Sequence, residues 1–327
     1  MLIDVVGGGS IGLLLSARLA GAGFQVNLWT RTEEQAELIN EHGLKLLAVD
    51  GSVAAEGLTV RAHCLAVRSQ TMKKFGQDMR WLLLCVKQTQ LSTELALDLQ
   101  ELTRGMDSRH ISVIALQNGF GHLQWLSKSL PECRIYAAIT TEGARKYDAY
   151  TVQHTGTGEV WISETAEGSR ELQMLEPDSQ ILLANMLQKA GISAYLSNDM
   201  YNRMLQKLLV NAVINPLTAI FDVPNGELLL ASNRISLMKT LYEETSDILQ
   251  KCGLGIDAAS GWEMVVRVCE LTASNISSML SDVRAGRTTE IAAINGAVIE
   301  LAHSAGVEAP VNKAVAVLVE SFRLRRE

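Results

Sequence analysis

Leu-Ile-Asp-Val-Val-Gly-Gly-Gly-Ser-Ile-Gly, residues 2–12, is the stretch that decides the fold. A short apolar strand runs into glycines at positions 7, 9 and 12, and a helical run from Leu13 to Ala22 follows. The glycines fit G-x-G-x-x-G in its required context of strand, tight turn and helix N-terminus. Glycine is needed because the turn demands unusual backbone angles, a side chain would block a pyrophosphate, and the helix packs close to the strand. The stretch therefore predicts a Rossmann-type dinucleotide-binding domain.

The free N–H groups and the positive dipole end at the start of this helix are suited to phosphates. The predicted cofactor contacts here are Gly7, Gly9, Ser10, Ile11 and Gly12. The same letters satisfy G-x-S-x-G around Ser10, the nucleophile elbow of hydrolases. That alternative needs an acid and a histidine downstream, and no pattern in the sequence points to them.

A second strand, Gln25 to Trp29, ends about 20 residues past the glycines, where an acidic residue would hold an NAD ribose. The chain has Arg31 there instead, and its glutamates come only after Thr32, in a predicted capping box that ends at Gln35. An arginine at the strand tip suits a 2′-phosphate, which favours NADP over NAD. The alternative is an ordinary surface arginine.

Two further apolar runs, Trp81 to Val86 and Ile111 to Leu116, are typical of buried parallel strands. They end at Lys87 and at Gln117-Asn118-Gly119. Ligands of open α/β sheets bind beyond the carboxyl ends of the strands, so Lys87 and Asn118 are predicted to touch cofactor or substrate. A solvated loop residue and a turn former remain the alternatives for these two positions.

Three later strands are predicted as an antiparallel extension of the sheet: Ile135 to Thr141, Tyr150 to His154, and Val160 to Ser163. Residues 43–76 predict only an irregular stretch that contains strands, and His154 is expected in the core or in a turn rather than in catalysis. From Met200 onward the periodicity is helical. We therefore predict an α/β domain over residues 1–198 and an all-α domain over residues 199–327.

Within the second half, Lys207, Asn211 and Asn215 are spaced i, i+4, i+8 on an otherwise apolar helix, so they form one narrow polar line. The line is either the solvent face of the helix or the lining of a cleft that holds a polar small molecule. Pro216 is expected to end or kink this helix. Further along, Glu290 opens another helix, where the dipole favours a carboxylate whatever its function.

The composition limits the classes of protein to which the chain can belong. With 327 residues, 47% hydrophobic and 20% charged, the chain is expected to be globular with about two domains. A net charge of −7 argues against nucleic acid as a partner. The five scattered cysteines predict reduced thiols of a cytoplasmic protein, and no spacing predicts a metal site. Neither a signal peptide nor an uninterrupted membrane-spanning run is expected.

These residues together resemble the 2-dehydropantoate 2-reductase (ketopantoate reductase) family nearly end to end. The resemblance rests on the glycine motif, Gln117-Asn118-Gly119, His154 to Gly158, Asn275 to Met279 and Thr289-Glu290-Ile291. Its most specific part is Lys207 through Glu227, with Lys-x3-Asn-x3-Asn-Pro-Leu-Thr-Ala and Pro-Asn-Gly-Glu. It implies a Rossmann domain and a helical domain like that of 6-phosphogluconate dehydrogenase, with the active site in a cleft.

By position, the resemblance implies that Lys207 is the catalytic proton donor to the ketone oxygen and that Glu290 is the acidic residue near the reacting centre. It implies substrate contacts at Asn118, Asn211, Asn215, Asn225, Asn275 and Ser278. It implies NADPH/NADP+ contacts at Gly7, Gly9, Ser10, Ile11, Gly12, Arg31, Lys87, Asn118 and Glu290.

The predicted activity is therefore NADPH-dependent reduction of 2-dehydropantoate to (R)-pantoate, in the pantothenate and coenzyme A pathway. The predicted partner is a small 2-oxo acid, with no nucleic acid or membrane, and the protein is expected as a monomer or homodimer. Two alternatives remain open: a reductase of another small oxo acid, and a non-catalytic NADPH sensor. A sensor would need none of Lys207, Asn211, Asn215 and Glu290.

Overall fold

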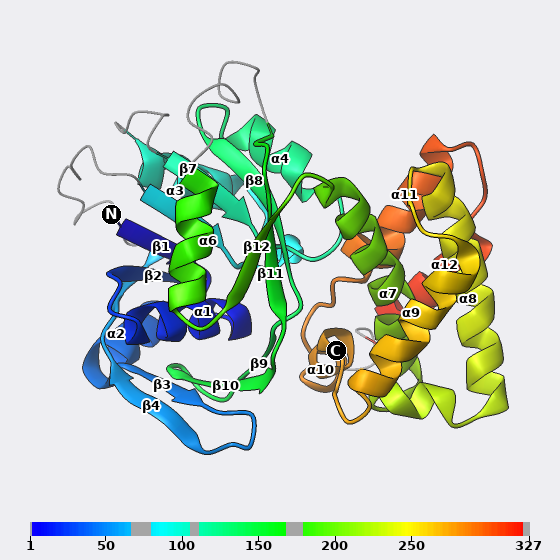
Figure 1. Ribbon diagram of the computed structural model, residues 1–327, viewed down its shortest axis with the longest axis horizontal. Coiled ribbons are helices and arrows are strands. Elements are labelled where there is room, and N and C mark those ends of the chain that lie inside the picture. Colours follow the sequence, from blue (N-terminus) through cyan, green and yellow to red (C-terminus); the bar gives the residue numbers. More distant parts are fainter. Residues whose placement is uncertain (1, 67–79, 105–110, 168–178, 323–327) are drawn as a thin grey trace. The chain divides into compact units, whose positions relative to one another are not determined.

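The computed structural model describes residues 2–66, 80–104, 111–167 and 179–322 (Figure 1). The chain packs as two compact units, and each is described by itself. The first comprises Met1–Gln117 and His122–Met200, and the second comprises Asn118–Gly121 and Tyr201–Glu327. The short segment Asn118–Gly121 thus packs with the second unit although its neighbours in sequence pack with the first. The predicted domain boundary at residue 198 stays a prediction, because clustering of contacts does not test independent folding.

The first unit is built on an eight-stranded sheet. In spatial order its strands are β12 (Ser193–Ser197), β11 (Glu159–Ser163), β8 (Arg134–Thr140), β7 (Ile111–Ala115), β6 (Arg80–Leu84), β1 (Leu2–Val6), β2 (Val26–Thr30) and β5 (Arg61–Cys64). The six neighbouring strands β8, β7, β6, β1, β2 and β5 all run parallel to one another. Ile3 of β1, for example, pairs with Val26 on one side and with Trp81 on the other. The order of these parallel strands is that of the doubly wound Rossmann sheet, so the predicted α/β fold class is confirmed.

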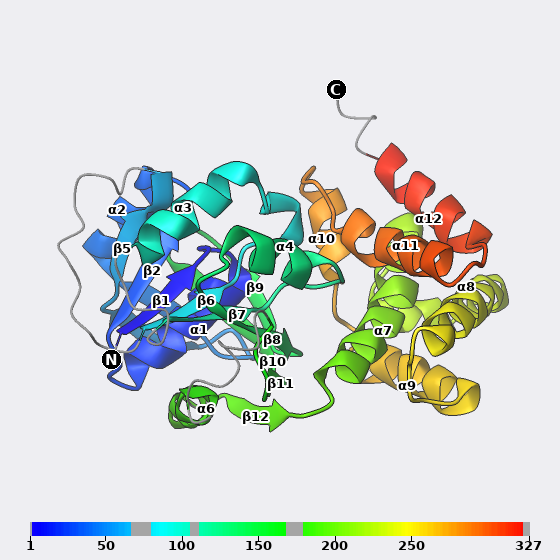
Figure 2. The same cartoon turned by 90° about the horizontal axis from the view of Figure 1, so that it is seen from above.

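Helices cover both faces of this sheet, as the continuous apolar strands require (Figure 2). One face packs on α1 (Ser10–Gly21) and α6 (Ser179–Lys189), and the other on α3 (Thr93–Thr103) and α4 (His122–Ser129). Helix α2 (Glu33–His42) joins the same core as α1. Thr32 caps α2 by accepting from the Gln35 N–H, as predicted, but the Gln35 side chain points elsewhere.

A second, four-stranded sheet packs against α1. Its strands in spatial order are β4 (Val53–Leu58), β3 (Leu44–Leu47), β10 (Thr151–Gly156) and β9 (Gly143–Lys146). The predicted antiparallel extension is therefore wrong for Ile135–Thr141, which runs parallel to β7, and for Tyr150–His154, which lies in this second sheet. It holds for β11, which is antiparallel to β8. Alternation marks one buried face of a strand, and it does not reveal which sheet provides the partner.

Three strands, β3, β4 and β5, occupy the part of residues 43–76 that the structure describes. The remainder of that predicted irregular stretch, residues 67–76, lies outside the described residues. These strands have only four to six residues, so they carry little period-2 signal, which explains why the sequence predicted no bounds.

The second unit is helical throughout its described residues, which confirms the predicted all-α character. Its helices are α7 (Met200–Phe221), α8 (Ser232–Lys251), α9 (Ala258–Leu271), α10 (Ser278–Arg284), α11 (Ala297–Ser304) and α12 (Pro310–Ser321), with a 3-10 turn (Asn225–Leu229) and a π-helical turn (Ala292–Gly296). Helix α7 lies in its core, where Leu205, Leu209 and Val213 are buried with residues of α8, α9, α11 and α12. By length and composition α7 would pass as a membrane span, yet 67% of its most apolar window is buried inside the protein.

Of the two predicted effects of Pro216, an end or a kink, the structure contradicts the first: α7 continues to Phe221. The proline ring removes the N–H that would donate to the Ala212 carbonyl, and the Asn295 amide donates to that carbonyl instead at 2.9 Å. Packing of both sides of α7 in the core outweighs the local penalty. No helix was predicted at α4, α10 or α12; the first two are short, with 8 and 7 residues.

A buried ion pair joins β1 to β6. Asp4 and Arg80 are 0% and 1% exposed, and the guanidinium binds the carboxylate through Nε and through Nη2 at 2.9 Å. The indole Nε1 of Trp29 donates to the same carboxylate at 2.6 Å, and Arg80 also donates to the Leu102 carbonyl in α3 at 2.9 Å. One carboxylate therefore ties together three strands and a helix.

We expect Asp4→Ala to lower the free energy of unfolding by about 3–5 kcal/mol, because it leaves the Arg80 charge buried without its partner. Urea unfolding measures the change. The matched control is Arg104→Ala, whose exposed pair with Glu101 should contribute no more than about 1 kcal/mol. A loss for Asp4→Ala as small as that of the control would contradict a stabilising role for the buried pair.

Candidate active site

The glycine-rich turn between β1 and α1 is closed by backbone contacts. Gly7 has a φ of +113°, and its N–H donates to the Trp29 carbonyl at 2.8 Å. A Cβ on Gly12 would lie 1.9 Å from the Gly7 carbonyl oxygen, far inside any allowed contact. The helix therefore approaches the strand at a distance that only glycine permits, as the motif predicted.

Gly9 has a different environment from Gly12. Its φ is −84°, and a Cβ placed on it would meet no atom within 4 Å. It caps α1 without a side-chain hydrogen bond, and the first turn of the helix carries no acidic residue. The turn thus offers open space beside free N–H donors and a positive helix end, which fits the pyrophosphate of a dinucleotide.

Ser10 does not have the environment of a hydrolase nucleophile. Its hydroxyl accepts a hydrogen bond from the Lys146 backbone N–H at 3.2 Å, and no imidazole bonds to it among the described residues. His154, which was expected in the core or in a turn, is 7% exposed in β10 and bridges Glu142 at 2.6 Å and Arg18 at 3.1 Å. The histidine is therefore engaged in a buried structural contact.

The other predicted cofactor residues of the first unit lie at strand ends. Arg31 follows β2 and is exposed, while Lys87 follows β6 and is half-buried as the cap of a 3-10 turn (Gln88–Gln90). Gln117, at the end of β7, donates to the Leu84 carbonyl at 2.9 Å and fixes the neighbouring strand end. These placements agree with the rule for parallel strands, and the cofactor roles themselves stay predictions.

Two residues beside the glycine-rich turn were missed by sequence reasoning. The ammonium of Lys146 and the amide of Gln35 both donate to the Gly8 carbonyl, each at 2.9 Å. Lys146 is 138 residues from Gly8 in sequence, so no short-range pattern could have indicated it. Only the packing of the β9–β10 hairpin brings it to the turn.

In the second unit, the predicted polar line on α7 is not an exposed face. Lys207 and Asn211 are half-buried and Asn215 is 9% exposed. Leu208 and Leu209, which follow Lys207 directly, are buried in the core. An ammonium and two amides thus lie in a sparingly hydrated environment. This arrangement favours the ligand-lining interpretation over the solvent-face one.

Lys207 has an altered acidity. Burial lowers the pKa of its ammonium from the ordinary 10.5 to about 8, and the nearby charge of Glu290 raises that pKa against the effect of burial. At neutral pH the ammonium form still predominates about tenfold. A lysine poised in this way can both donate and accept a proton near physiological pH.

Glu290 is 5% exposed and accepts a hydrogen bond from the Asn118 amide at 3.2 Å. The contact depends on how the segment Asn118–Gly121 docks on the π-helical turn, where the Phe120 N–H donates to the Ala293 carbonyl at 3.2 Å. A Cβ on Gly119, which has a φ of +85°, would lie 2.1 Å from that carbonyl. Docking of this segment therefore requires the glycine at position 119. Such π-helical turns are frequent at functional sites.

The remaining predicted substrate residues lie near the start of α10. The Asn225 N–H donates to the Asn275 carbonyl at 3.0 Å, and the Asn225 amide donates to the Thr272 hydroxyl at 2.9 Å. Ser278 is exposed, whereas its neighbour Ser277, which sequence reasoning missed, is buried and caps α10. Asn225 and Asn275 therefore share a structural contact, and their proposed substrate roles are not tested by it.

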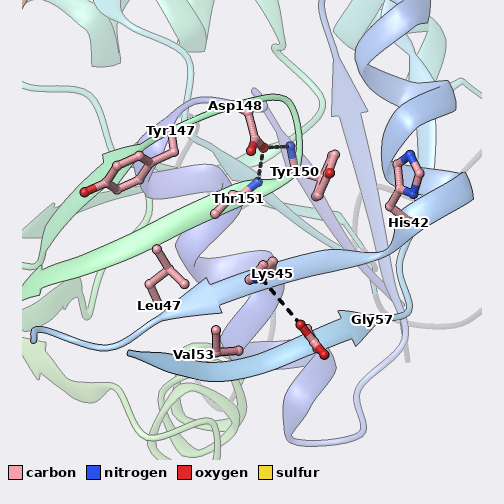
Figure 3. Close-up of a pocket in the computed structure, with 10 residues that line it drawn as sticks. His42, Lys45, Leu47, Val53, Gly57, Tyr147, Asp148, Tyr150 and Thr151 are labelled. Carbon is pink, nitrogen blue, oxygen red and sulfur yellow. Dashed lines mark hydrogen bonds and ion pairs between the residues drawn. The ribbon is translucent and has the colours of Figure 1, made fainter. Parts of the chain in front are cut away.

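A surface hollow lies elsewhere, on the four-stranded sheet (Figure 3). It measures about 740 Å³ and is lined by residues of β3, β4 and the β9–β10 hairpin, among them Lys45, Val53 and Thr151. None of the predicted site residues lines it. Within the described ranges, no three His, Cys, Asp or Glu side chains cluster as metal ligands would.

The sheet order, the glycine-rich turn and the helical second unit define a Rossmann-type dinucleotide-binding protein. Comparison with family models then narrows the class. The model described as ketopantoate reductase PanE/ApbA matches residues 3–167, and its C-terminal counterpart matches residues 199–322. The chain belongs to the ketopantoate reductase PanE/ApbA family, which confirms the resemblance found in the sequence.

Similar proteins agree with this assignment. A 2-dehydropantoate 2-reductase of Bacillus subtilis is 33% identical over 94% of this chain and 93% of its own. The crystal structure of a probable 2-dehydropantoate 2-reductase from Bacillus subtilis has a TM-score of 0.76 at 30% identity, covering 98% of this chain and 100% of that one. A ternary D-mandelate dehydrogenase structure with NADH and anilino(oxo)acetate has a TM-score of 0.83 over 99% of both chains, but its 23% identity shows the fold alone.

Two glycine substitutions should separate binding from folding. We expect Gly9→Ala to leave the melting temperature unchanged, because its Cβ enters open space at an ordinary φ, yet to weaken dinucleotide binding by filling that space. Gly12→Ala should lower the melting temperature, because its Cβ collides with the Gly7 carbonyl. Thermal unfolding and fluorescence titration with NADPH test both. Tight dinucleotide binding by Gly9→Ala would contradict the predicted position of the pyrophosphate.

Proposed function

We propose that this protein reduces 2-dehydropantoate to (R)-pantoate with NADPH, in the pathway to pantothenate and coenzyme A. The proposal is supported by family membership, by the names of the relatives and, above all, by one observation. This observation is that Lys207 lies half-buried on a polar line of a core helix, where the charge of the buried Glu290 acts on its ammonium.

The chemistry follows from the charge that develops on the substrate. Reduction of a ketone builds negative charge on its oxygen, and a positioned ammonium both stabilises that charge and supplies the proton. Bound NADPH would supply the hydride, held by the glycine-rich turn with Arg31 and Lys87. Lys207 is the proposed general acid.

The neighbouring side chains have supporting roles in this proposal. Glu290 keeps Lys207 protonated at neutral pH, and Asn118 orients the Glu290 carboxylate through its amide. The amides of Asn211 and Asn215 offer donors to a substrate carboxylate and acceptors to a hydroxyl group. A small 2-oxo acid is accordingly the proposed partner, for a cytoplasmic enzyme.

The direct test is NADPH consumption by the purified protein with 2-dehydropantoate and with a panel of other 2-oxo acids. We expect turnover on 2-dehydropantoate at a kcat/KM well above that of every other acid. Turnover only on another acid would replace the substrate and keep the reductase. Tight NADPH binding with no turnover on any acid would overturn the activity and favour the sensor.

Lys207→Ala should lower turnover about a hundredfold or more while NADPH affinity changes little, as expected on loss of a general acid. In the wild-type protein, kcat/KM for reduction should fall as the pH rises through about 8, because only the ammonium form can donate the proton. Initial rates from pH 6 to 10 measure this descending limb of the pH profile.

Glu290→Gln is the matched variant. It removes the charge that raises the Lys207 pKa, so the same limb should move to lower pH. A limb that persists in Lys207→Ala, or one that stays in place in Glu290→Gln, would remove this pair from the proposed mechanism.

A further inference from the structure

Lys146 lies at the end of β9 and contacts the glycine-rich turn twice. Its backbone N–H donates to the Ser10 hydroxyl at 3.2 Å, and its ammonium donates to the Gly8 carbonyl at 2.9 Å. The side chain is half-buried. An ammonium is thus held against the turn that, in the proposed function, receives the dinucleotide.

A second cation, Arg31, acts on Lys146. Loss of water lowers the pKa of the Lys146 ammonium, the nearby Asp148 carboxylate raises it, and the charge of Arg31 lowers it further. Asp148 is engaged by its own hairpin, where it accepts the N–H groups of Tyr150 at 2.9 Å and Thr151 at 2.6 Å (Figure 3). Among the ion pairs of the described residues, none joins Arg31 or Lys146 to a carboxylate.

The Lys146 charge is not required to fasten the turn. Gln35 already donates its neutral amide to the Gly8 carbonyl at 2.9 Å and to the Ala149 carbonyl at 2.9 Å, so it links the same turn to the same hairpin. The positive charges of Arg31 and Lys146 disfavour each other, as the lowered pKa of Lys146 indicates, and a bound dianion would remove that repulsion. An ammonium has three donors, so it can keep the Gly8 contact and still bind a phosphate oxygen.

We propose that Lys146 and Arg31 together bind the 2′-phosphate of NADPH, which makes Lys146 a second residue that determines cofactor specificity. The proposal rests on the cofactor part of the proposed function. It adds a cation from a hairpin far along the chain to the arginine that the sequence indicated at the tip of β2.

The test measures dissociation constants rather than turnover. NADPH and NADH are titrated against the wild-type protein, Lys146→Met and Lys146→Arg, with adenosine 2′,5′-bisphosphate and AMP as fragments. Lys45→Met is the control, because Lys45 pairs with Glu56 at 3.5 Å in the neighbouring strand (Figure 3). Among the described residues, its side chain forms no hydrogen bond or ion pair with the turn.

We expect Lys146→Met to weaken NADPH and the bisphosphate about tenfold, the equivalent of one charge-assisted contact, and to change NADH and AMP about twofold or less. Lys146→Arg should keep most of the discrimination, and Lys45→Met should bind all four ligands like the wild type. Arg31→Ala combined with Lys146→Met should depart from additivity, because both side chains serve one phosphate group.

Three results would overturn the proposal. Equal weakening of NADPH and NADH would place Lys146 at the pyrophosphate, and unchanged binding of both would remove it from the site. If Lys146→Met lowers the melting temperature and Lys146→Arg restores folding without restoring the preference for NADPH, the role is structural only.

Failure of the proposed function is distinguishable from these results. A protein that binds NADPH more tightly than NADH, yet reduces no 2-oxo acid, contradicts the proposed activity and leaves the role of Lys146 standing. A wild-type protein without any preference for NADPH overturns the cofactor assignment and the role of Lys146 together.

Discussion

The approach of helix α1 to strand β1 is the constraint on which the first unit depends. The Gly12 Cα lies so near the Gly7 carbonyl that any side chain would collide with it. That contact directs α1 across the sheet, and α1 in turn forms the common core of the large and the small sheet. Because the small sheet carries the β9–β10 hairpin, the same contact also fixes where Lys146 meets the turn. A local steric requirement therefore determines an arrangement of residues more than a hundred positions apart.

The second unit is organised around a polar line in an apolar core. Helix α7 buries its leucines and valines on most sides, so the water left around Lys207, Asn211 and Asn215 is limited. Limited hydration lowers the pKa of the lysine, and the Glu290 carboxylate, just before the π-helical turn, counteracts part of the effect. The stability of the helix and the acidity of the lysine thus have one origin, which is the burial of α7. Docking of the segment Asn118–Gly121 on the same turn adds the amide that binds Glu290.

Sequence patterns predicted the structure correctly where a feature depends only on residues close together in the chain. The glycine motif, the continuous apolar strands and the spacing of the polar line each have a direct steric or periodic meaning, and the fold class and family followed from them. They failed where the outcome depends on a distant partner. Period-2 alternation in Tyr150–His154 could not tell the large sheet from the small one. Pro216 was expected to end or kink α7, yet the helix continues to Phe221, because core packing and the Asn295 amide on the Ala212 carbonyl offset the missing N–H.

By itself, the sequence determined that the chain is a Rossmann-type α/β unit followed by a helical one, and it named the residues of the candidate site. Those features rest on interactions within a few residues, namely steric limits at glycine, strand burial and helical spacing. Tertiary structure alone decided which charges act on one another. The influence of Glu290 on Lys207, the contact of Asn118 with that carboxylate and the influence of Arg31 on Lys146 all join distant segments. Electrostatic interactions depend on distance and hydration in the folded chain, and neither is encoded in the spacing of residues along it.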